Sequence, residues 1–202
     1  MQPGSADHQV RSRSSSQRIT EPTHRGWHSR GYLPHFDSSA VLQTVTYRVA
    51  DALPIEVAKR LHRALSDTEE IEHRKRIESY LDAGHGSCPL HDPTCAAIVR
   101  DGLLFHDRDR YLLHAWVIMP NHVHALIEPA AGWGLSSIVK TWKSYSAKRI
   151  NRHLARTGAL WQADYWDRFI GDEAHYRNVV SYILGNPAKA GLHEWIWTST
   201  GS

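Results

Sequence analysis

Apolar and polar residues alternate or cluster in four short stretches that predict extended structure. Residues 40–51 (AVLQTVTYRVAD) are rich in β-branched side chains and partly alternating. Two apolar stretches, about 110–119 and 122–128, flank the turn Met119-Pro120-Asn121, and residues 160–170 (LWQADYWDRFI) mix aromatic and polar side chains. Stretches of this length and composition, bounded by turn residues, are typical of β-strands. The first three are predicted to be strands and the fourth to be extended.

Helical periodicity fills much of the remaining chain. Apolar residues three and four positions apart run through residues 53–84, interrupted by Ser-Asp-Thr, which predicts two helices or one bent helix. Residues 92–107 begin with Asp and Pro, residues 135–156 form a longer periodic stretch, and Asp172 precedes a final one, which are typical helix starts. Neighbouring strands and blocks of helices predict an α+β fold, with one antiparallel sheet and helices packed on it.

The chain is predicted to be one domain between two tails. Its 202 residues can bury one sizeable core, but residues 1–25 are polar and rich in Ser and Arg, so disorder is expected there. This leaves residues 26–197 as the domain and residues 198–202 as a short tail. No apolar run of about 18 residues is present and the first thirty residues lack the apolar centre of a secretory signal, which predicts a cytoplasmic protein without a membrane partner. Two cysteines are too few for a disulfide framework, in agreement with a reducing compartment.

Two histidines interrupt the most apolar stretch of the sequence. His122 and His124 alternate with Val123 and Ala125, so in a strand both imidazoles point to the same face. Neutral imidazole is a common metal ligand, and two of them on one rigid strand can bind one ion. The alternative is a pair of surface or hydrogen-bonded histidines in a chain that has 15 of them. The spacing alone leaves both interpretations open.

Four motifs, taken in order, resemble a known family. They are AWVIMPNHVHALIEP (115–129), KTWKSYSAKRIN (140–151), LWQADYWDRFI and SYILGNPAKAGL (181–192). Together they are similar to the REP-associated tyrosine transposases, IS200-like members of the HUH class of single-strand DNA endonucleases, and the resemblance covers about residues 26–195. It implies a ferredoxin-like or RRM-like α+β domain. It also implies a bacterial protein that associates with the nucleoid. Such a protein, a monomer or homodimer, would cut and rejoin single-stranded DNA next to palindromic repeat hairpins through a 5′-phosphotyrosine.

The resemblance also assigns the site residues. His122 and His124 match the pair that binds a divalent ion at the scissile phosphate. Histidine nitrogens completed by phosphate and water oxygens suit Mg²⁺ or Mn²⁺, although Zn²⁺ would also accept such a site. Tyr182 matches the catalytic tyrosine, and Asn186, one helical turn later, matches the residue that supplies a third metal ligand.

The final predicted helix can be analysed by its own periodicity. Its apolar stripe consists of Tyr176, Val179, Val180, Ile183 and Leu184. Tyr182 falls outside this stripe, with Asn178 and Asn186 four residues before and after it. A purely structural role for Tyr182 is the alternative. Pro187 is expected to push Asn186 out of regular helix geometry, and no general base is evident in the sequence.

Basic and aromatic residues predict DNA contacts in two segments. On the helix of residues 135–156 the candidates for backbone contacts are Lys140, Lys143, Lys148, Arg149 and Arg152. In the arm before the first strand they are Arg25, Arg30 and Tyr32. The alternative for the helix is a basic face that is merely solvated.

Other interpretations fit parts of the sequence. A histidine-triad phosphohydrolase would need a third histidine where the chain has Leu126. A DNA-binding protein of transposase descent, which binds hairpins without cutting them, is an alternative that stays open. His85, Cys88, His91 and Cys95 could supply zinc ligands, but their spacing matches no common zinc site, and free thiols are expected.

Overall fold

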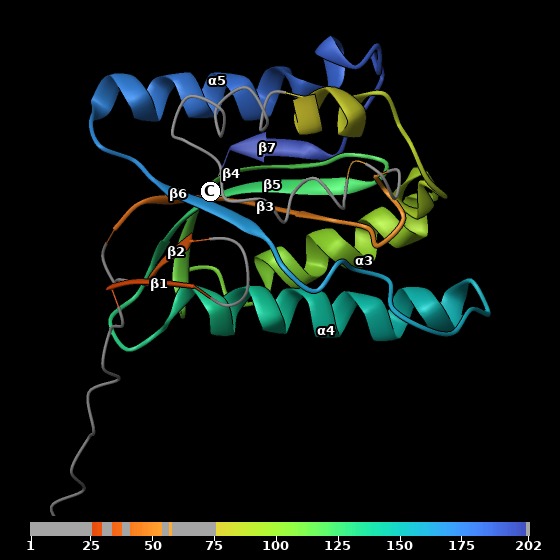
Figure 1. Cartoon of the computed structure of the whole chain (residues 1–202), viewed down its shortest axis with the longest axis horizontal. Helices are drawn as coiled ribbons and strands as arrows, with labels where there is room; N and C mark the ends of the chain where they lie inside the picture. The colour runs from red at the N-terminus through yellow and green to blue at the C-terminus, as the bar shows by residue number, and fades with distance from the viewer. Residues whose placement is uncertain (1–25, 30–33, 38–40, 54–56, 58–75, 201–202) are drawn as a thin grey trace, which may run out of the picture.

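The computed structural model describes residues 26–29, 34–37, 41–53, 57 and 76–200. Its centre is an antiparallel sheet with the strand order β6-β3-β5-β4-β7 (Figure 1). The strands are β3 (Gln43–Arg48), β4 (Tyr111–Ile118), β5 (His122–Pro129), β6 (Trp166–Phe169) and β7 (Thr198–Thr200). The three predicted strands and the extended fourth segment are confirmed. The prediction of a tail that begins at residue 198 is wrong, because residues 198–200 form β7, which pairs with β4 at the edge of the sheet.

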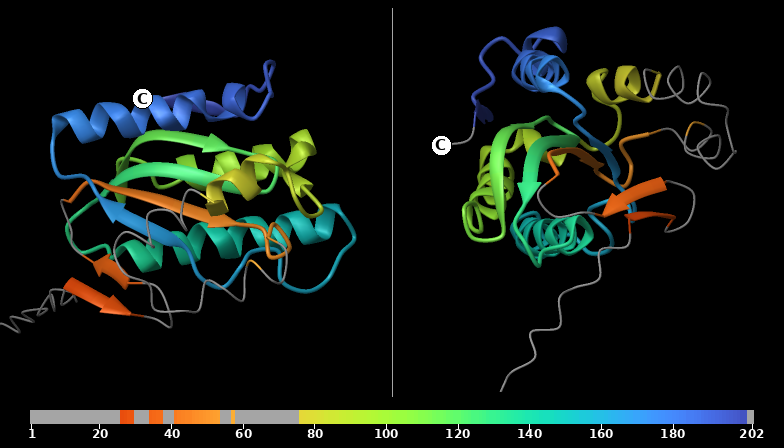
Figure 2. Two further views of the ribbon diagram at one scale, coloured as in Figure 1. Left: turned by 45° about the horizontal axis from the view of Figure 1, so that its top comes forward. Right: turned by 90° about the vertical axis from the view of Figure 1, so that its left-hand side faces the viewer.

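Helices cover both faces of this sheet (Figure 1, Figure 2). The helices α3 (Pro93–Leu104) and α4 (Leu135–His153) lie on one face, and α5 (Glu173–Lys189) lies on the other. Residues 76–82 are also helical and lie beside α5. This arrangement confirms the predicted α+β fold. Within the described part of the chain, no helix is both long and apolar enough to span a membrane.

Two smaller elements complete the described fold. The strands β1 (Gly26–Ser29) and β2 (Pro34–Asp37) form an antiparallel hairpin, and β2 contacts β6. A 3-10 turn, η1 (Pro89–His91), precedes α3. The tail of residues 1–25 and most of the helical stretch predicted before residue 76 lie outside the described residues.

The helix starts follow the capping signals in the sequence. The carboxylate of Asp92 accepts hydrogen bonds from the backbone N–H groups of Thr94 and Cys95, and Pro follows at the first helical position of α3. The carboxylate of Asp172 accepts from the N–H of His175 at the start of α5. Each carboxylate satisfies amides that the helix leaves without a partner at its N-terminus.

The main core lies between the sheet and the α3–α4 layer. Its strand residues include Val45, Tyr47, Val123, Ala125 and Ile127, which alternate along β3 and β5 and are at most 1% exposed. An aromatic chain of hydrogen bonds crosses this layer. The Tyr111 hydroxyl donates to the carbonyl of Leu103, and the indole N–H of Trp142 donates to the Tyr111 oxygen.

The opposite face of the same strands carries a smaller core and the polar residues. A β-bulge at His114 shifts the register of β4, so that Ala115 and Val117 face α5. They pack with Leu126 and with Ile183 of α5. His122 and His124 share the alternation of Leu126 along β5, so both imidazoles point to the interface between the sheet and α5.

Candidate active site

A tight turn places the histidine pair at the start of β5. The backbone oxygen of Asn121 accepts from the N–H of Val49, and Asn121 itself is completely buried. Its Nδ2 donates to the carbonyl of His85 at 2.9 Å, which fixes the orientation of the amide because a carbonyl can only accept. Asn121 Oδ1 therefore faces His122 Nδ1 at 2.8 Å and accepts a hydrogen bond from its N–H group. The Nε2 atom of His122 is left with a free lone pair.

The second histidine is held by a hydroxyl group on the neighbouring strand. His124 Nδ1 lies 2.7 Å from Thr46 Oγ1, and the two Nε2 atoms of the pair are 3.1 Å apart. A hydroxyl can donate or accept, so Thr46 supports either tautomer of His124. With a proton on Nε2, His124 donates to His122. With the proton on Nδ1, both Nε2 lone pairs face a common point.

Burial keeps both imidazoles neutral. It lowers the pKa of His122 far below its ordinary value, with further contributions from the nearby His124 and Lys189. Burial, followed by the charge of Lys189, lowers the pKa of His124 to about 3. Neutral imidazole is the form that binds metal ions. Two ligands held about 2.1 Å from one ion lie about 3.0 Å apart when they meet it at a right angle, so the observed 3.1 Å fits a shared ion.

Tyr182 faces the histidine pair from α5. Its ring centre lies 5.4 Å from that of His124, in an edge-to-face arrangement, and it packs against the smaller core. The prediction that Tyr182 lies off the core-facing side of the helix is therefore wrong. Leu184, assigned to the apolar stripe, is 37% exposed instead. The sheet is polar where the histidines lie, so the helix side that covers it carries polar residues as well.

Asn186 lies one turn further along α5 and is completely buried. The helix continues through Pro187 to Lys189, so the expected departure of Asn186 from helix geometry is wrong. Both amide atoms of Asn186 and the Tyr182 hydroxyl lack a hydrogen bond of normal geometry among the described residues. Asn186 still lies close enough to lower the pKa of Tyr182. Buried polar atoms without partners are costly, and an amide oxygen in this state is a suitable ligand for a hard cation.

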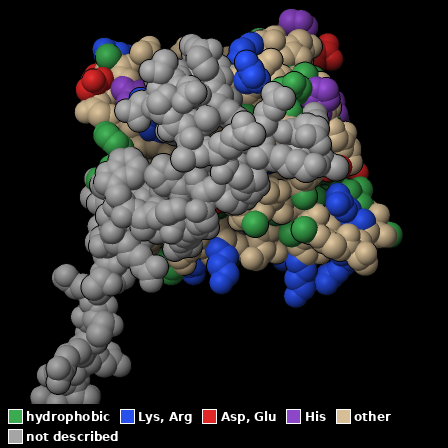
Figure 3. Space-filling view, in the orientation of Figure 1, with side chains coloured by type: hydrophobic (Ala, Val, Ile, Leu, Met, Phe, Trp, Pro, Cys, Tyr) green, Lys and Arg blue, Asp and Glu red, His purple; other side chains and the backbone are tan. Residues whose placement is uncertain are grey.

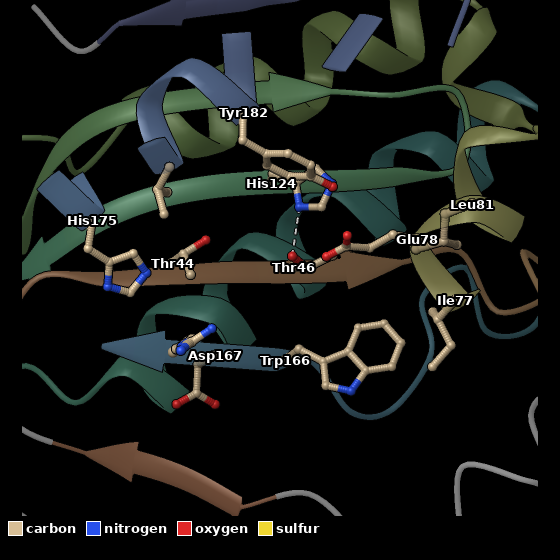
Figure 4. A pocket seen from close by; sticks show the side chains of 12 residues that line it. Thr44, Thr46, Ile77, Glu78, Leu81, His124, Trp166, Asp167, His175 and Tyr182 are labelled. Carbon is tan, nitrogen blue, oxygen red and sulfur yellow. Dashed lines mark hydrogen bonds between the residues drawn. The ribbon is translucent and has the colours of Figure 1, made fainter. Parts of the chain in front are cut away.

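The electrostatic environment of Tyr182 opposes its ionisation. Burial raises the pKa of Tyr182 well above the usual value of a phenol, and the carboxylates of Glu78 and Asp82 raise it further. Lys189 provides positive charge, with Nζ 5.6 Å from the centre of the Tyr182 ring and 2.9 Å from Asp82 Oδ2. Figure 4 shows Glu78 pointing toward Tyr182 and Thr46. Glu78 was not predictable from the sequence, because nothing in its local pattern connects it with residues more than forty positions later.

The basic residues of α4 lie across the sheet from the histidine pair (Figure 1). Lys140, Lys148, Arg149 and Arg152 are exposed, and Lys and Arg side chains project along the lower edge of the molecule in Figure 3, where α4 lies. Lys143 differs, because its Nζ donates to the carbonyl groups of residues 162, 163 and 164, and burial lowers its pKa to about 8. The basic residues of α4 therefore lie on the other face of the sheet from His122, His124 and Tyr182. Arg25, Arg30 and Tyr32 of the arm lie outside the described residues.

Both cysteines of the suggested zinc segment are free. Within the described residues, the group of three or more possible ligand side chains that comes together is Asp92, Cys95 and His153. The Asp92 carboxylate already caps α3 and pairs with His153 Nε2 at 2.9 Å, so its structural role accounts for the cluster.

Part of the chain is similar to known proteins. Residues 105–186, which include the histidine pair, Tyr182 and Asn186, match the model of the family described as "Transposase IS200 like". A REP-associated tyrosine transposase of Escherichia coli (strain K12) is 28% identical over 104 residues, which are 49% of this chain and 56% of that protein. The chain thus matches little more than half the length of this relative.

The fold has a counterpart among solved structures. One described as a REP-associated tyrosine transposase bound to a REP hairpin superposes with a TM-score of 0.50 at 18% identity, covering 81% of this chain and 79% of that chain. At this identity the likeness shows the fold. Residues 105–186 are similar to the IS200-like transposases, and the resemblance to REP-associated tyrosine transposases, predicted from the motifs, is confirmed.

Proposed function

We propose that this protein cleaves and rejoins single-stranded DNA next to hairpins formed by palindromic repeats. The observation that carries the proposal is the convergence of two neutral imidazoles and a tyrosine across one interface: His122 and His124 on β5 and Tyr182 on α5. The family of residues 105–186 supports a strand-transfer reaction. The hairpin substrate is suggested by the description of the solved relative.

Tyr182 is the nucleophile of the proposed reaction. Its oxygen attacks the phosphorus, the bond from phosphorus to the 3′ oxygen breaks, and the DNA becomes joined to the protein through a 5′-phosphotyrosine. The tyrosine loses its proton and the departing 3′ oxygen gains one. Attack by a 3′-hydroxyl on the phosphotyrosine reverses these changes and joins strands, so the exchange needs no external energy source.

The metal that the family implies fits these residues. His122 Nε2, His124 Nε2 and the partnerless Oδ1 of Asn186 would hold a divalent ion, Mg²⁺ or Mn²⁺. A bound divalent ion would neutralise charge on the phosphate. Asn121 and Thr46 hold the two imidazoles from behind, and Lys189 adds positive charge beside the Tyr182 ring. Positive charge beside the ring favours loss of the phenol proton, which burial and the carboxylates of Glu78 and Asp82 oppose.

DNA contacts away from the cut are proposed for two segments. The exposed residues of α4 suit contacts to backbone phosphates of the hairpin, since they lie across the sheet from Tyr182. Arg25, Arg30 and Tyr32 are proposed to contact the single-stranded flank. Lys143 is expected to contribute least, because it is engaged with three backbone carbonyls.

The test is to trap and map the covalent adduct. Wild-type protein is incubated with Mg²⁺ and a 3′-labelled hairpin oligonucleotide with single-stranded flanks, and the products are separated on a denaturing gel. A labelled protein band is expected, with the DNA mapped by peptide sequencing to Tyr182. Tyr182→Phe should bind the hairpin without forming the band, whereas Tyr176→Phe on the same helix should still form it. Hairpin binding by the wild type without any adduct would favour the alternative of a binding protein that does not cut.

A further inference from the structure

A cavity of about 210 Å³ extends from the proposed nucleophile across the edge of the sheet. Tyr182 and His124 contribute to its lining, and it continues over β3 and β6 to the indole of Trp166 (Figure 4). Helical residues 76–82 and the first half of α5 form its other walls, through Ile77, Leu81 and Val179 among others. The cavity is therefore continuous with the site where the phosphate would be attacked.

The sheet register explains how Trp166 comes to face this site. Thr46 pairs with His124 on one side and with Trp166 on the other, so these three residues form one row across neighbouring strands. Directly paired residues of antiparallel strands share a face, and strands are spaced about 4.8 Å apart. Trp166 thus lies on the same face as the histidine pair, about 10 Å away in the sheet. The Arg48 guanidinium lies 4.6 Å over the indole and supports it.

The lining combines flat apolar surface with polar and charged groups, the charged ones being Glu78, Asp167 and Arg168. Trp166, Ile77, Leu81 and Val179 provide apolar contact area. Thr44 and His175 place a hydroxyl and an imidazole at the margin, as Figure 4 shows. An unstacked nucleobase has complementary surfaces: two apolar faces that stack on aromatic side chains and a polar edge that forms hydrogen bonds.

We propose that this cavity binds one unpaired nucleobase of the strand being cut, next to the phosphate that Tyr182 attacks. The inference rests on the proposed DNA-cleaving function. Trp166 stacks on the base and so holds the adjacent phosphate at the histidine pair. The base is bound from the single-stranded flank, because a base paired within the hairpin stem is stacked on its neighbours and cannot enter a cavity of this size.

The first experiment locates the base by fluorescence. In the Tyr182→Phe protein, which leaves the DNA uncut, 2-aminopurine replaces each unpaired position of the hairpin oligonucleotide in turn. One position should be strongly quenched on binding, next to the cut mapped with the wild type. Trp166→Ala in the same protein should remove the quenching at that position alone. Trp133→Ala is the matched control, since this indole is also half-buried and stacked by an arginine (Arg110, 4.1 Å) but does not line the cavity.

The second experiment removes the base rather than the indole. An abasic site at the quenched position should lower the affinity of the Tyr182→Phe protein about tenfold, the usual contribution of one stacked base. In the protein that also carries Trp166→Ala, the abasic site should cause little further loss, while Trp166→Phe should preserve most of the effect.

The outcomes separate this inference from the proposed function. The base site is overturned if no position shows quenching that depends on Trp166. It is also overturned if the abasic site lowers the affinity equally in the proteins with and without the indole. The cavity would then be filled by another part of the protein or by solvent. If quenching at one position depends on Trp166 but the wild type forms no covalent adduct, base binding is supported and cleavage is rejected. If the wild type forms the adduct but no position shows quenching that depends on Trp166, cleavage is supported and the base site is rejected.

Discussion

The two faces of the central sheet are built from the same strands but differ in how their polar groups are satisfied. On the α3–α4 face the polar atoms of Tyr111 and Trp142 are hydrogen-bonded within an apolar core, although the Tyr47 hydroxyl and Asn151 Oδ1 have no partner. On the α5 face the Tyr182 hydroxyl and both amide atoms of Asn186 are buried without hydrogen bonds. Each such atom costs about 1–3 kcal/mol. On the α5 face these costly atoms lie together on one helix, within one turn of each other and beside the histidine pair, where a bound ligand would satisfy them.

The largest expected effect is on the rate of DNA cleavage, and it distinguishes the two faces of β5. His122→Ala and His124→Ala should each lower the rate of DNA cleavage by more than about 100-fold, because the ligands of the proposed ion are removed. Ile127→Ala, on the opposite face of β5, should lower the free energy of unfolding by about 2–5 kcal/mol, because less apolar surface is buried. Cleavage assays at saturating DNA and urea unfolding, applied to all three variants, measure the two quantities.

The controls for this comparison concern metal and fold. The two histidine variants should still bind the hairpin, and their circular dichroism spectra should match the wild type. EDTA should abolish wild-type cleavage, and added Mg²⁺ or Mn²⁺ should restore it. Full activity in EDTA would contradict the proposed metal site, and a histidine variant with undiminished cleavage would remove that residue from the chemistry.

A smaller effect is expected from the residue that supports His124. Thr46→Val keeps the shape of the side chain but removes the hydroxyl that lies 2.7 Å from His124 Nδ1. Loss of such a support typically lowers metal affinity about 10–100-fold. Isothermal titration of the metal-free protein with Mn²⁺ would measure this change, with Thr44→Val, two residues earlier on the same face, as the matched control. Equal Mn²⁺ affinity in Thr46→Val and the wild type would show that the hydroxyl does not orient the imidazole.

The polar face should also make stability depend on pH. Burial lowers the folded-state pKa of both histidines, to about 3 for His124, whereas an unfolded histidine titrates near 6.5. Below about pH 6.5 the unfolded chain therefore binds more protons than the folded protein, and stability falls as the pH falls toward the folded-state pKa. Each histidine contributes up to about 1.4 kcal/mol per pH unit in this range and nothing above it.

Urea unfolding of metal-free protein between pH 7.5 and 5 would measure this slope. A variant with both histidines replaced by alanine should lose most of it. An unchanged slope in that variant would assign the pH dependence to other groups of the protein.

Local patterns were sufficient to predict one half of the site. The alternation of His122 and His124 with apolar residues depends only on strand geometry, and the two imidazoles do lie on one face, with Nε2 atoms 3.1 Å apart. The helix starts at Asp92 and Asp172 were predictable for the same reason, since a cap acts on amides two or three residues away.

The other half depends on what each element packs against. The periodicity of α5 suggested an apolar stripe that excluded Tyr182, because periodicity assumes that the covered surface is apolar. Here the helix covers the histidines, so its buried side includes Tyr182 and Asn186. Glu78 approaches Tyr182 only through tertiary packing of the helical segment 76–82. Likewise, the position of α4 across the sheet could not be inferred from its stripe of charges.

The smallest expected effect concerns that basic stripe. Replacing Lys148, Arg149 and Arg152 together by glutamine should weaken hairpin binding several-fold at low salt. It should also reduce the dependence of the logarithm of affinity on the logarithm of salt concentration by about 0.9 for each DNA phosphate that the variant no longer neutralises. The cleavage rate of fully bound DNA should not change, because α4 lies on the other face of the sheet from Tyr182.

The matched control for this variant is Lys143→Gln on the same helix. Lys143 donates to three backbone carbonyls of the segment after α4, so its replacement should lower stability while leaving the salt dependence of binding unchanged. Fluorescence anisotropy at several salt concentrations distinguishes the two variants. If the triple variant binds with the wild-type salt dependence, the stripe is a solvated face of the helix, and other residues of the chain bind the phosphates of the hairpin.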